Sequence, residues 1–541
     1  MDFRAISKGG WKYFIITLTL IISCESQDNN KPSGVNFSEQ PLKLRSYYEE
    51  MLVNQFIMDI SKANQRTSYV LSNATLIEPE TGEVIPEGII VVDNGIILYS
   101  GSSNNLGIDI DESFERIDIE GQYVIPGLID MHVHTVNSNN QKLLNLINGV
   151  TSVREMAGQQ WMINVREQIK NDSLLAPNLY VASNMLNYYS LGMHTTVVKD
   201  AEDVEKVISG FKTTGYDFVK VWNNMPENLF KEVIKQSNLN GLKVVGHIPT
   251  KVRIEEALPK MHTVEHMKGY VSNSNQEITT EDYVNLTQKY SPWLCPTFYA
   301  SNVGLYGEEA DSLINHSEIS KYISPYEIQE WIESKQINDN LGESSPYVKQ
   351  LNNMKIVFKK LERINPNYIS GTDSGGGYSF LVPGFGLHDE IFNFFELGLS
   401  PLEALQTATS NASKALGKEG ELGTLKKGSR ADFIVLNNNP LDNIYNIKRI
   451  EKVVIRGRII DSTILNQIKK ILGDIYKPEK DLFASQEQAV ADIVKFYSNK
   501  CSTFLMKPHK LEELSADLSV NGYTIEAKRI LNIKSKIFRD N

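Results

Sequence analysis

The sequence predicts an α/β fold in which a (β/α)8, TIM-like barrel is inserted into a small β-sandwich domain and followed by a helical extension. Strand-like runs alternate with helical segments about eight times in residues 124–420, the pattern of parallel βα units. The eight predicted strands end at Val133, Arg154, Met185, Val221, Gly246, Glu265, Pro296 and Gly371. Short β-rich runs separated by turn signals flank this stretch, in residues 67–123 and 421–463, and we expect these two pieces to close one sandwich. Residues 464–541 have helical periodicity.

The first 23 residues resemble the signal peptide of a bacterial lipoprotein. Positive charges precede an apolar run that is too short to span a bilayer, and Ile-Ile-Ser-Cys then makes Cys24 the residue that would be acylated. Residues 24–66 follow as a polar tether and an N-terminal helix. We therefore expect a lipid-anchored protein of the cell envelope, at the periplasmic or outer-membrane face. An uncleaved anchor and an ordinary secretory signal are the alternatives.

Charge and cysteine content limit the classes of partner. The net charge is −11 and no long basic run occurs, so binding to nucleic acid by phosphate neutralisation is not expected. The three cysteines, Cys24, Cys295 and Cys501, are too few for a disulfide framework. The predicted partners are a small-molecule or dipeptide substrate and a membrane. The sequence leaves open whether the chain forms a homo-oligomer.

Side chains that can ligate metal ions stand at the ends of the predicted barrel strands. The first strand ends in His-x-His, so both imidazoles leave it on the same side. A lysine within the apolar fourth strand must be paired, deprotonated or modified, and as a carbamate it could bridge two cations. Because barrel strands present their C-terminal ends at one face, we expect six residues to converge there: His132, His134, Lys220, His247, His266 and Asp373.

Each of these residues also has a structural interpretation when it is taken alone. A single buried histidine is more often hydrogen-bonded within a core than bound to a metal ion, and a buried lysine is more often ion-paired. The six residues, however, fall in order on strands one, four, five, six and eight. This joint pattern favours a site for two divalent metal ions.

The same residues resemble those of the amidohydrolase superfamily. The matching features are Val-Ile-Pro-Gly-Leu-Ile-Asp-Met-His-Val-His at 124–134, the order of the six ligands, and Gly-Thr-Asp-Ser-Gly at 371–375. Residues 149–155 and 386–390 further resemble the imidazolonepropionase-related group, which includes metal-dependent prolidases and Xaa-Arg dipeptidases. The resemblance covers about residues 69–461.

The resemblance implies a role for each ligand. The histidines of the first strand would hold the more buried ion, those of the fifth and sixth strands the more exposed ion, and carboxylated Lys220 would bridge the two. Asp373 would bind the first ion, accept a proton from the attacking hydroxide and deliver it to the leaving amine. The ions in this family are usually zinc, and this ligand set also suits manganese, cobalt or iron.

The predicted activity is hydrolysis, by a metal-bridging hydroxide, of an amide or peptide bond in a small molecule, with a dipeptide as first choice. The second interpretation is a mononuclear cyclic-amide hydrolase or deaminase of the imidazolonepropionase type, which would not need Lys220. Lactone or carbamate hydrolysis would use the same site, and a non-catalytic binding lipoprotein is the alternative from another class. The sequence also departs from the dipeptidases, with His247-Ile-Pro-Thr where His-Ala-x-Gly is usual and Glu155 where aspartate is common.

Three further side chains are candidates for substrate contact. His194 lies in a glycine- and histidine-containing loop after the third strand, and could bind substrate or serve only the loop. His388 could contact substrate or organise the loop after the eighth strand. Arg154 could bind a substrate carboxylate with two hydrogen bonds, or pair with a neighbouring acid.

Two more elements complete the predicted barrel domain. The sequence Ser-Pro-Leu-Glu from Ser400 has the capping residues of a helix start, and Gly417 can end this closing helix. A long insertion with helical periodicity separates the seventh and eighth strands at residues 299–365. It is either a lid over the pocket or a solvated helical decoration.

Overall fold

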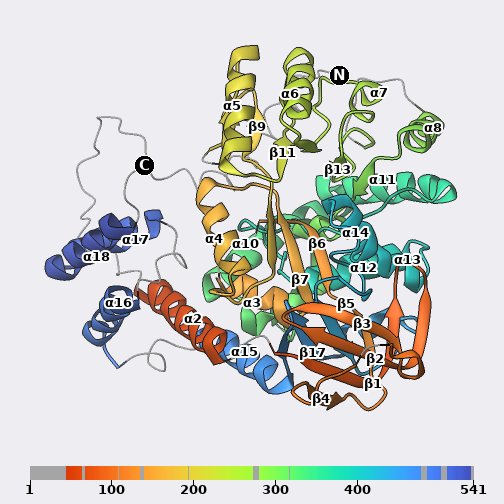
Figure 1. Cartoon of the computed structure of the whole chain (residues 1–541). Helices are drawn as coiled ribbons and strands as arrows, with labels where there is room; N and C mark the ends of the chain where they lie inside the picture. The colour runs from red at the N-terminus through yellow and green to blue at the C-terminus, as the bar shows by residue number, and fades with distance from the viewer. Residues whose placement is uncertain are drawn as a thin grey trace.

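The computed structural model describes residues 44–63, 67–107, 109–134, 139–192, 194–271, 279–315, 317–476, 484–500 and 508–537. These residues form a mixed α/β fold with sheets of eight, six and four strands (Figure 1). The predicted signal peptide, Cys24, most of the tether and Cys501 lie outside the described residues. None of the helices within these ranges is both long enough and apolar enough to cross a membrane.

The eight-stranded sheet combines strands from both flanking pieces of the sequence. Its order is β18-β17-β16-β5-β1-β2-β3, with β4 also paired to β1, so the residues predicted to form a sandwich lie in a single sheet. The hairpin between β2 and β3 turns at Asn94 and Gly95, whose φ angles of 49° and 83° are those of a two-residue hairpin turn. The strands are β1 (Tyr69–Glu78), β2 (Glu83–Asp93), β3 (Ile96–Ser102), β4 (Glu115–Asp118), β5 (Tyr123–Pro126), β16 (Phe433–Leu436), β17 (Ile450–Ile455) and β18 (Arg458–Ile460).

Two parallel sheets contain the predicted barrel strands. Their orders are β15-β6-β7-β8 and β10-β9-β11-β12-β13-β14. They do not form one continuous closed barrel, because only isolated parallel bridges join them, Ala182 with Phe218 at one edge and Leu294 with Tyr368 at the other. The strands are β6 (Leu128–His134), β7 (Val150–Glu155), β8 (Asn178–Val181), β9 (Met185–Asn187), β10 (Thr195–Val197), β11 (Phe218–Val221), β12 (Lys243–Gly246), β13 (Thr263–Glu265), β14 (Trp293–Cys295) and β15 (Ser374–Gly375).

Two barrel strands differ from the prediction. The third strand, expected to end at Met185, ends at Val181 because the next residues bond across to β11, where the Ser183 N–H donates to the Phe218 carbonyl at 2.9 Å. Residues 185–187 then form the separate strand β9. The eighth strand, expected to end at Gly371, is an irregular segment whose backbone bonds to β14 and β6, followed by the two-residue β15.

Amphipathic helices follow the parallel strands and bury one face against them. In α5 the side chain of Asp200 caps the first turn, Val204 and Ile208 are buried one turn apart, and Gly215 ends the helix at a φ of 93°. The helices of this part are α3 (Asn139–Ile147), α4 (Gln160–Lys170), α5 (Ala201–Thr214), α6 (Glu227–Leu239), α7 (Ile254–Ala257), α8 (Thr280–Tyr290), α12 (Phe385–Glu396), α13 (Pro401–Thr407) and α14 (Ser410–Leu416).

The predicted closing helix is divided into α13 and α14. The capping box of Ser400 and Glu403 is present, with each side chain bonded to the other residue's backbone N–H. Gly417 ends α14 at a φ of 70°, as predicted. The division occurs because the carbonyls of Thr407 and Ala408 accept hydrogen bonds from the eighth-strand segment and from β6, at 3.0 and 2.8 Å. These carbonyls therefore tie the end of α13 to the strands.

The insertion is helical and lies against the loop that follows β15. It contains α9 (Gly307–Asn315), α10 (Pro325–Leu341) and α11 (Pro346–Leu361). From α10, Trp331 packs on Phe380 with ring centroids 5.0 Å apart, and the Ser334 hydroxyl lies 2.7 Å from that of Ser379. The insertion thus adjoins the loop that leads away from the C-terminal ends of the strands.

Helices from the two ends of the described chain form a separate apolar cluster. The helix α2 packs with α16, α17 and α18 through residues that include Tyr47, Ile493, Leu514 and Ile530. These four helices lie together at one side of the molecule, and α15 leads toward them from the eight-stranded sheet (Figure 1). Their bounds are α2 (Leu44–Ala63), α15 (Ser462–Asp474), α16 (Gln486–Lys500), α17 (Pro508–Val520) and α18 (Thr524–Ile537).

Candidate metal centre

His132, His134 and Asp373 converge at the C-terminal end of β6. The Nε2 atoms of the two histidines lie 3.2 and 3.1 Å from the same Asp373 Oδ1. His132 Nδ1 lies 2.9 Å from Glu265 Oε2, and His134 Nδ1 lies 3.2 Å from Glu155 Oε1. An imidazole that donates its Nδ1 proton to a carboxylate keeps a lone pair on Nε2. Both Nε2 atoms are therefore available as metal ligands.

His247 and His266 follow β12 and β13 and extend the cluster. His247 Nδ1 lies 2.7 Å from Asn223 Oδ1. His266 Nδ1 lies 2.6 Å from the Thr297 hydroxyl, which donates to the carbonyl of its preceding residue and therefore accepts from the ring. His247 Nε2 is buried and has no hydrogen-bond partner among the described residues. The ring centroid of His266 lies 4.6 Å from that of His132 and 5.0 Å from that of His247.

Lys220 projects from β11 into this cluster. Its side chain is fully buried, and its Nζ lies 3.3 Å from His132 Nε2. Burial lowers the pKa of the Lys220 amine to about 8, because a charged ammonium loses its hydration in the interior. An amine with this pKa is partly neutral near pH 7, and only a neutral amine can take up carbon dioxide.

Glu265 links the cluster to a buried arginine. Its Oε1 accepts a hydrogen bond from Arg154 Nη2 at 2.8 Å, while its Oε2 accepts from His132, and the side chains of Arg154 and Glu265 are both fully buried. Burial raises the pKa of Glu265, but the Arg154 guanidinium and the bond from His132 outweigh burial and hold this pKa far below its usual range. The ionised Glu265 therefore fixes the tautomer of His132.

Of the two roles that the sequence allows for Arg154, contact with a substrate carboxylate and an ion pair with an acid, the structure shows the ion pair. All three nitrogens of its guanidinium bond to the interior, since Nε donates to the Met131 carbonyl at 2.6 Å, Nη1 to the Thr263 hydroxyl at 3.2 Å, and Nη2 to Glu265. The side chain reaches from β7 to β13 and has no exposed surface. Arg154 instead forms a structural ion pair, with an acid from a distant strand.

His388 and His194 lie further from the ligand cluster. His388 is on α12 rather than on a loop, is buried, and its Nε2 lies 2.8 Å from the Asn148 carbonyl. This contact packs α12 against the end of α3, so His388 has an organising role. His194 is partly exposed, with its Nδ1 3.5 Å from Gln159 Nε2. His194 stays a predicted substrate contact.

Three residues of the site have a left-handed backbone. His266, Thr297 and Asp373 have φ angles of 55°, 55° and 59°. A residue other than glycine in this region costs of order 1–3 kcal/mol, and such strain is concentrated at functional sites. The unusual φ of His266 and Thr297 occurs just beyond a strand, and that of Asp373 just before β15. In each case the backbone turns there and sets the direction of a ligand or of the group that orients a ligand.

Sequence reasoning did not find the residues that orient the histidines. These are Glu155, Asn223, Glu265 and Thr297, and each accepts a hydrogen bond from one imidazole Nδ1. A usable signal was present, because each of the four is a polar residue at the end of a barrel strand or within two residues of it. The pairing across the sheets, such as Glu265 with His132, could not be read from spacing.

The donor atoms of this cluster fit divalent metal ions. The ligand atoms of His132, His134 and Asp373 lie within 4.8 Å of one another, as the ligands of one ion do. The Nε2 atom of His247 carries a lone pair and is buried without a hydrogen-bond partner among the described residues. Burying a polar atom in this way costs free energy unless a ligand satisfies it. Imidazole nitrogen with carboxylate oxygen is a donor set that zinc and related ions prefer.

Comparison with known proteins gives a family match over part of the chain and a distant relative that is matched over three quarters of the chain. The Amidohydrolase family matches residues 358–460, the end of the barrel region and the last strands of the eight-stranded sheet. Adenine deaminase 3 of Rhizobium meliloti is 23% identical over 421 residues, which are 75% of this chain and 59% of that protein. The chain thus spans less than two thirds of that relative.

Two solved structures share the fold. Bottromycin amidohydrolase superposes with a TM-score of 0.64 at 20% identity, over 80% of this chain and 96% of its own. A Xaa-Pro dipeptidase with methionine bound in its active site superposes with a TM-score of 0.57 at 18% identity, over 73% of this chain and all of its own. At these sequence identities the similarity shows a shared fold and does not identify the substrate.

Proposed function

We propose that this chain, whose residues 358–460 match the Amidohydrolase family, is a member of the amidohydrolase superfamily and a metal-dependent hydrolase of amide or peptide bonds in small molecules, with a dipeptide as first candidate. The observation that carries the proposal is the hydrogen bonding of four histidines, each of which uses Nδ1 and keeps Nε2 as a ligand atom. The Xaa-Pro dipeptidase that shares the fold supports a dipeptide substrate, and we place the chain in the imidazolonepropionase-related, prolidase-like group.

The proposed site holds two divalent ions, zinc by preference, at the mouth of one (β/α)8 barrel. The parallel bridges at both edges of the two sheets support a single barrel wall. His132 and His134 with Asp373 would hold one ion, and His247 and His266 the other. Lys220, whose buried amine lies beside His132 Nε2, would react with carbon dioxide to form a carbamate and release a proton, and the carbamate oxygens would serve as further ligands of the two ions.

Divalent ions bound here would lower the pKa of a water and polarise the carbonyl of the scissile bond. Asp373 would accept the proton of the attacking water on its free carboxylate oxygen. The same carboxylate would then deliver that proton to the leaving nitrogen as the carbon–nitrogen bond breaks, so that no proton is gained or lost. Glu155 and Glu265 would keep the imidazoles beside Asp373 in the required tautomer and orientation.

A deaminase is the second candidate, favoured by the similarity to adenine deaminase 3 over three quarters of the chain. Deamination also adds water at a carbon bonded to nitrogen, and a single ion held by the histidines of β6 and β12 would suffice for it. Lys220 distinguishes the amide hydrolase from the deaminase. A site with two ions would use Lys220 as a ligand, whereas a site with one ion would not need it. A binding lipoprotein without catalysis is the third candidate.

The first experiment is to measure metal stoichiometry by elemental mass spectrometry on the purified protein. Two ions per chain would support the bridged hydrolytic site and direct the next screen to dipeptides and other small amides. One ion would favour the deaminase and direct the screen to adenine and its nucleosides. No metal, even after reconstitution with zinc, manganese or cobalt, would overturn both enzyme proposals in favour of a binding protein.

We also propose that the protein is anchored in the cell envelope by lipid on Cys24. The lipoprotein-like signal in residues 1–24 supports this proposal. Metabolic labelling with a fatty-acid analogue should mark the wild-type protein and should not mark a Cys24→Ala variant. Equal labelling of the two, or no labelling of either, would contradict the anchor.

A further inference from the structure

A second cavity lies at the opposite end of the parallel strands from the metal ligands. It has a volume of about 490 Å³, within the usual range of small-molecule sites, and we call it the basal cavity. Its walls are the N-terminal end of β8, the start of β11, one side of α4 and the turn between β2 and β3. Parallel strands separate their two ends by their full length, so this cavity is distinct from the candidate metal centre.

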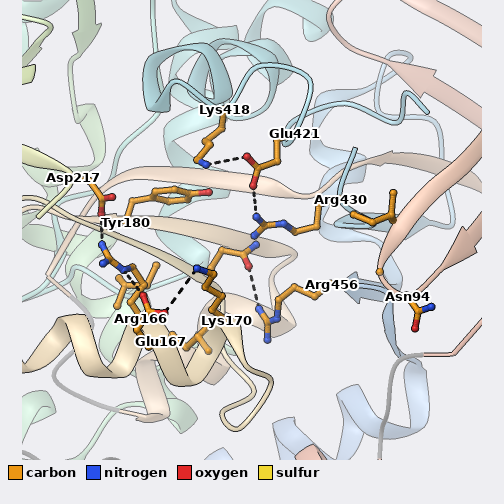
Figure 2. Close-up of a pocket in the computed structure, with 15 residues that line it drawn as sticks. Asn94, Arg166, Glu167, Lys170, Tyr180, Asp217, Lys418, Glu421, Arg430 and Arg456 are labelled. Atoms are coloured by element: carbon orange, nitrogen blue, oxygen red, sulfur yellow. Dashed lines mark hydrogen bonds and ion pairs between the residues drawn. The ribbon is translucent and has the colours of Figure 1, made fainter. Parts of the chain in front are cut away.

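Cationic side chains outnumber acidic ones on the walls of the basal cavity. It is lined by five lysines and arginines but by only three acids, in a chain whose net charge is −11. Glu421 is shared by Lys418, at 2.9 Å, and by Arg430. Figure 2 shows Lys170, Arg430 and Arg456 extending into the same space from different elements. The local charge thus favours an anionic ligand.

Arg456 has a nitrogen that the protein leaves without a partner. The side chain is 3% exposed, and its Nε donates to Asp172 at 2.8 Å while Nη1 donates to the Ala176 carbonyl at 3.0 Å and to Asn178 Oδ1 at 3.2 Å. Nη2 has no hydrogen-bond partner among the described residues. Asp172 also faces Arg458, whose Nε lies 3.9 Å away, so its single charge is divided between two guanidinium groups.

We propose that the basal cavity binds a small ligand carrying a phosphate or carboxylate group, with Arg430 and Lys170 as its donors. The buried guanidinium group of Arg456 lies behind them and adds positive charge to the wall of the cavity, because a guanidinium group carries only donors and stays charged. Planar guanidinium groups bind such oxyanions with paired, charge-assisted hydrogen bonds. Arg430 and Arg456 flank the strands of the eight-stranded sheet, whereas Lys170 is on α4, so the bound anion connects the sheet to the parallel-stranded region.

The proposal is tested by calorimetric titration of the full-length protein with inorganic phosphate and, separately, with succinate, at ionic strength held constant with chloride. Saturable binding of one ion per chain is expected for at least one of the two, and their ranking assigns the ligand to phosphate or carboxylate. Lys170→Met and Arg430→Gln should each weaken binding at least about tenfold, the loss of one charge-assisted hydrogen bond.

Lys170→Met is the decisive variant, because the Lys170 side chain is 74% exposed and its loss leaves the core untouched. Lys206→Met is its matched control, since Lys206 is an exposed lysine on α5 away from the cavity. Binding unchanged in both cavity variants would overturn the proposal and place the anion at the metal centre. The absence of saturable binding by either anion would also overturn it.

Discussion

The two ends of the parallel strands each contain a buried nitrogen without a partner among the described residues, yet they suit ligands of opposite charge. At the C-terminal ends this nitrogen is His247 Nε2, and at the basal cavity it is Arg456 Nη2. A neutral imidazole nitrogen carries a lone pair and can bind a cation, whereas a guanidinium nitrogen can only donate. The chemistry of the unpartnered atom therefore decides which ligand each end can accept.

The carboxylates at the candidate metal centre and those near the basal cavity also have different hydrogen-bond partners. At the metal centre, Glu155 and Glu265 each accept from one imidazole and so determine its tautomer, which leaves Asp373 facing the ligand space. At the basal cavity, Glu421 and Asp172 each face two cations. Carboxylates that accept hydrogen bonds from imidazole Nδ1 leave the Nε2 lone pairs available to a cation. A carboxylate that is shared between two cationic side chains neutralises only one of the two charges, so positive charge remains. The predictions below separate the two ends.

The largest expected effect is that of Glu265→Gln on stability. Removing one partner of a fully buried ion pair leaves the Arg154 charge uncompensated, which costs about 3–5 kcal/mol. The free energy of unfolding, measured by denaturant titration, should fall by that amount, and metal affinity should fall because His132 loses its orienting partner. The control is Glu256→Gln, which removes an exposed ion pair with Lys260. An equal free energy of unfolding of the two variants would show that the buried Arg154–Glu265 pair stabilises the fold no more than the exposed pair does.

Asp373→Asn should come next, with an effect confined to the metal end. We expect turnover to fall at least about 100-fold, the lower end for a lost acid–base group, while the fold and anion binding at the basal cavity stay unchanged. Steady-state kinetics on the substrate found by screening measures this, with the exposed Asp442→Asn as control. Near-normal turnover would contradict the proton-transfer role of Asp373.

Lys220→Ala should remove a ligand that a small molecule can replace. We expect loss of most bound metal and of activity, with partial recovery of both in the presence of short carboxylic acids, which can occupy the space of the lost carbamate. Metal content and turnover are measured with and without formate or acetate, against Lys243→Ala, an exposed lysine on β12. Two bound metal ions and full activity in Lys220→Ala would exclude the carbamate.

The sequence indicated which side chains would meet at the candidate metal centre, whereas it gave no sign of the basal cavity. His132, His134, Lys220, His247, His266 and Asp373 were identifiable because each ends or lies within an apolar strand, and parallel strands bring such positions together. The residues of the basal cavity come from a helix, strand starts, a hairpin turn and loops of the flanking pieces. No periodicity relates Lys170 to Arg430 or Arg456, so only the folded chain places them together.

Where the sequence prediction and the structure differ, the cause is a contact between elements that are distant in the sequence. Arg154 lies at a strand end, as a substrate-binding residue would. Its side chain instead points into the interior and bonds to Glu265 on β13, and the spacing of residues in the sequence does not indicate this pairing. The single closing helix was expected because Ser400, Pro401 and Glu403 are start signals of a helix and Gly417 is a stop signal. It divides because the carbonyls of Thr407 and Ala408 bond to the strands instead of continuing the helix, which is a tertiary effect.

The smallest predicted effect, from Ser400→Ala, should leave both ends as they are. Removing the N-cap of α13 should lower the free energy of unfolding by about 1 kcal/mol, and the exposed Ser209→Ala on α5 should change it little. The hydrogen bonds from the Ser400 side chain and backbone lower the pKa of Glu403 below its ordinary value. A carboxylate whose pKa is lower in the folded state contributes stability above its unfolded pKa, and that contribution is lost as pH falls through the folded value. The stability difference between wild type and Ser400→Ala, measured by urea unfolding, should therefore shrink as the pH falls through the folded pKa of Glu403, whereas metal content and anion affinity at neutral pH should match those of wild type. A change in either ligand would mean that the two ends are coupled through α13, and their comparison as independent sites would fail.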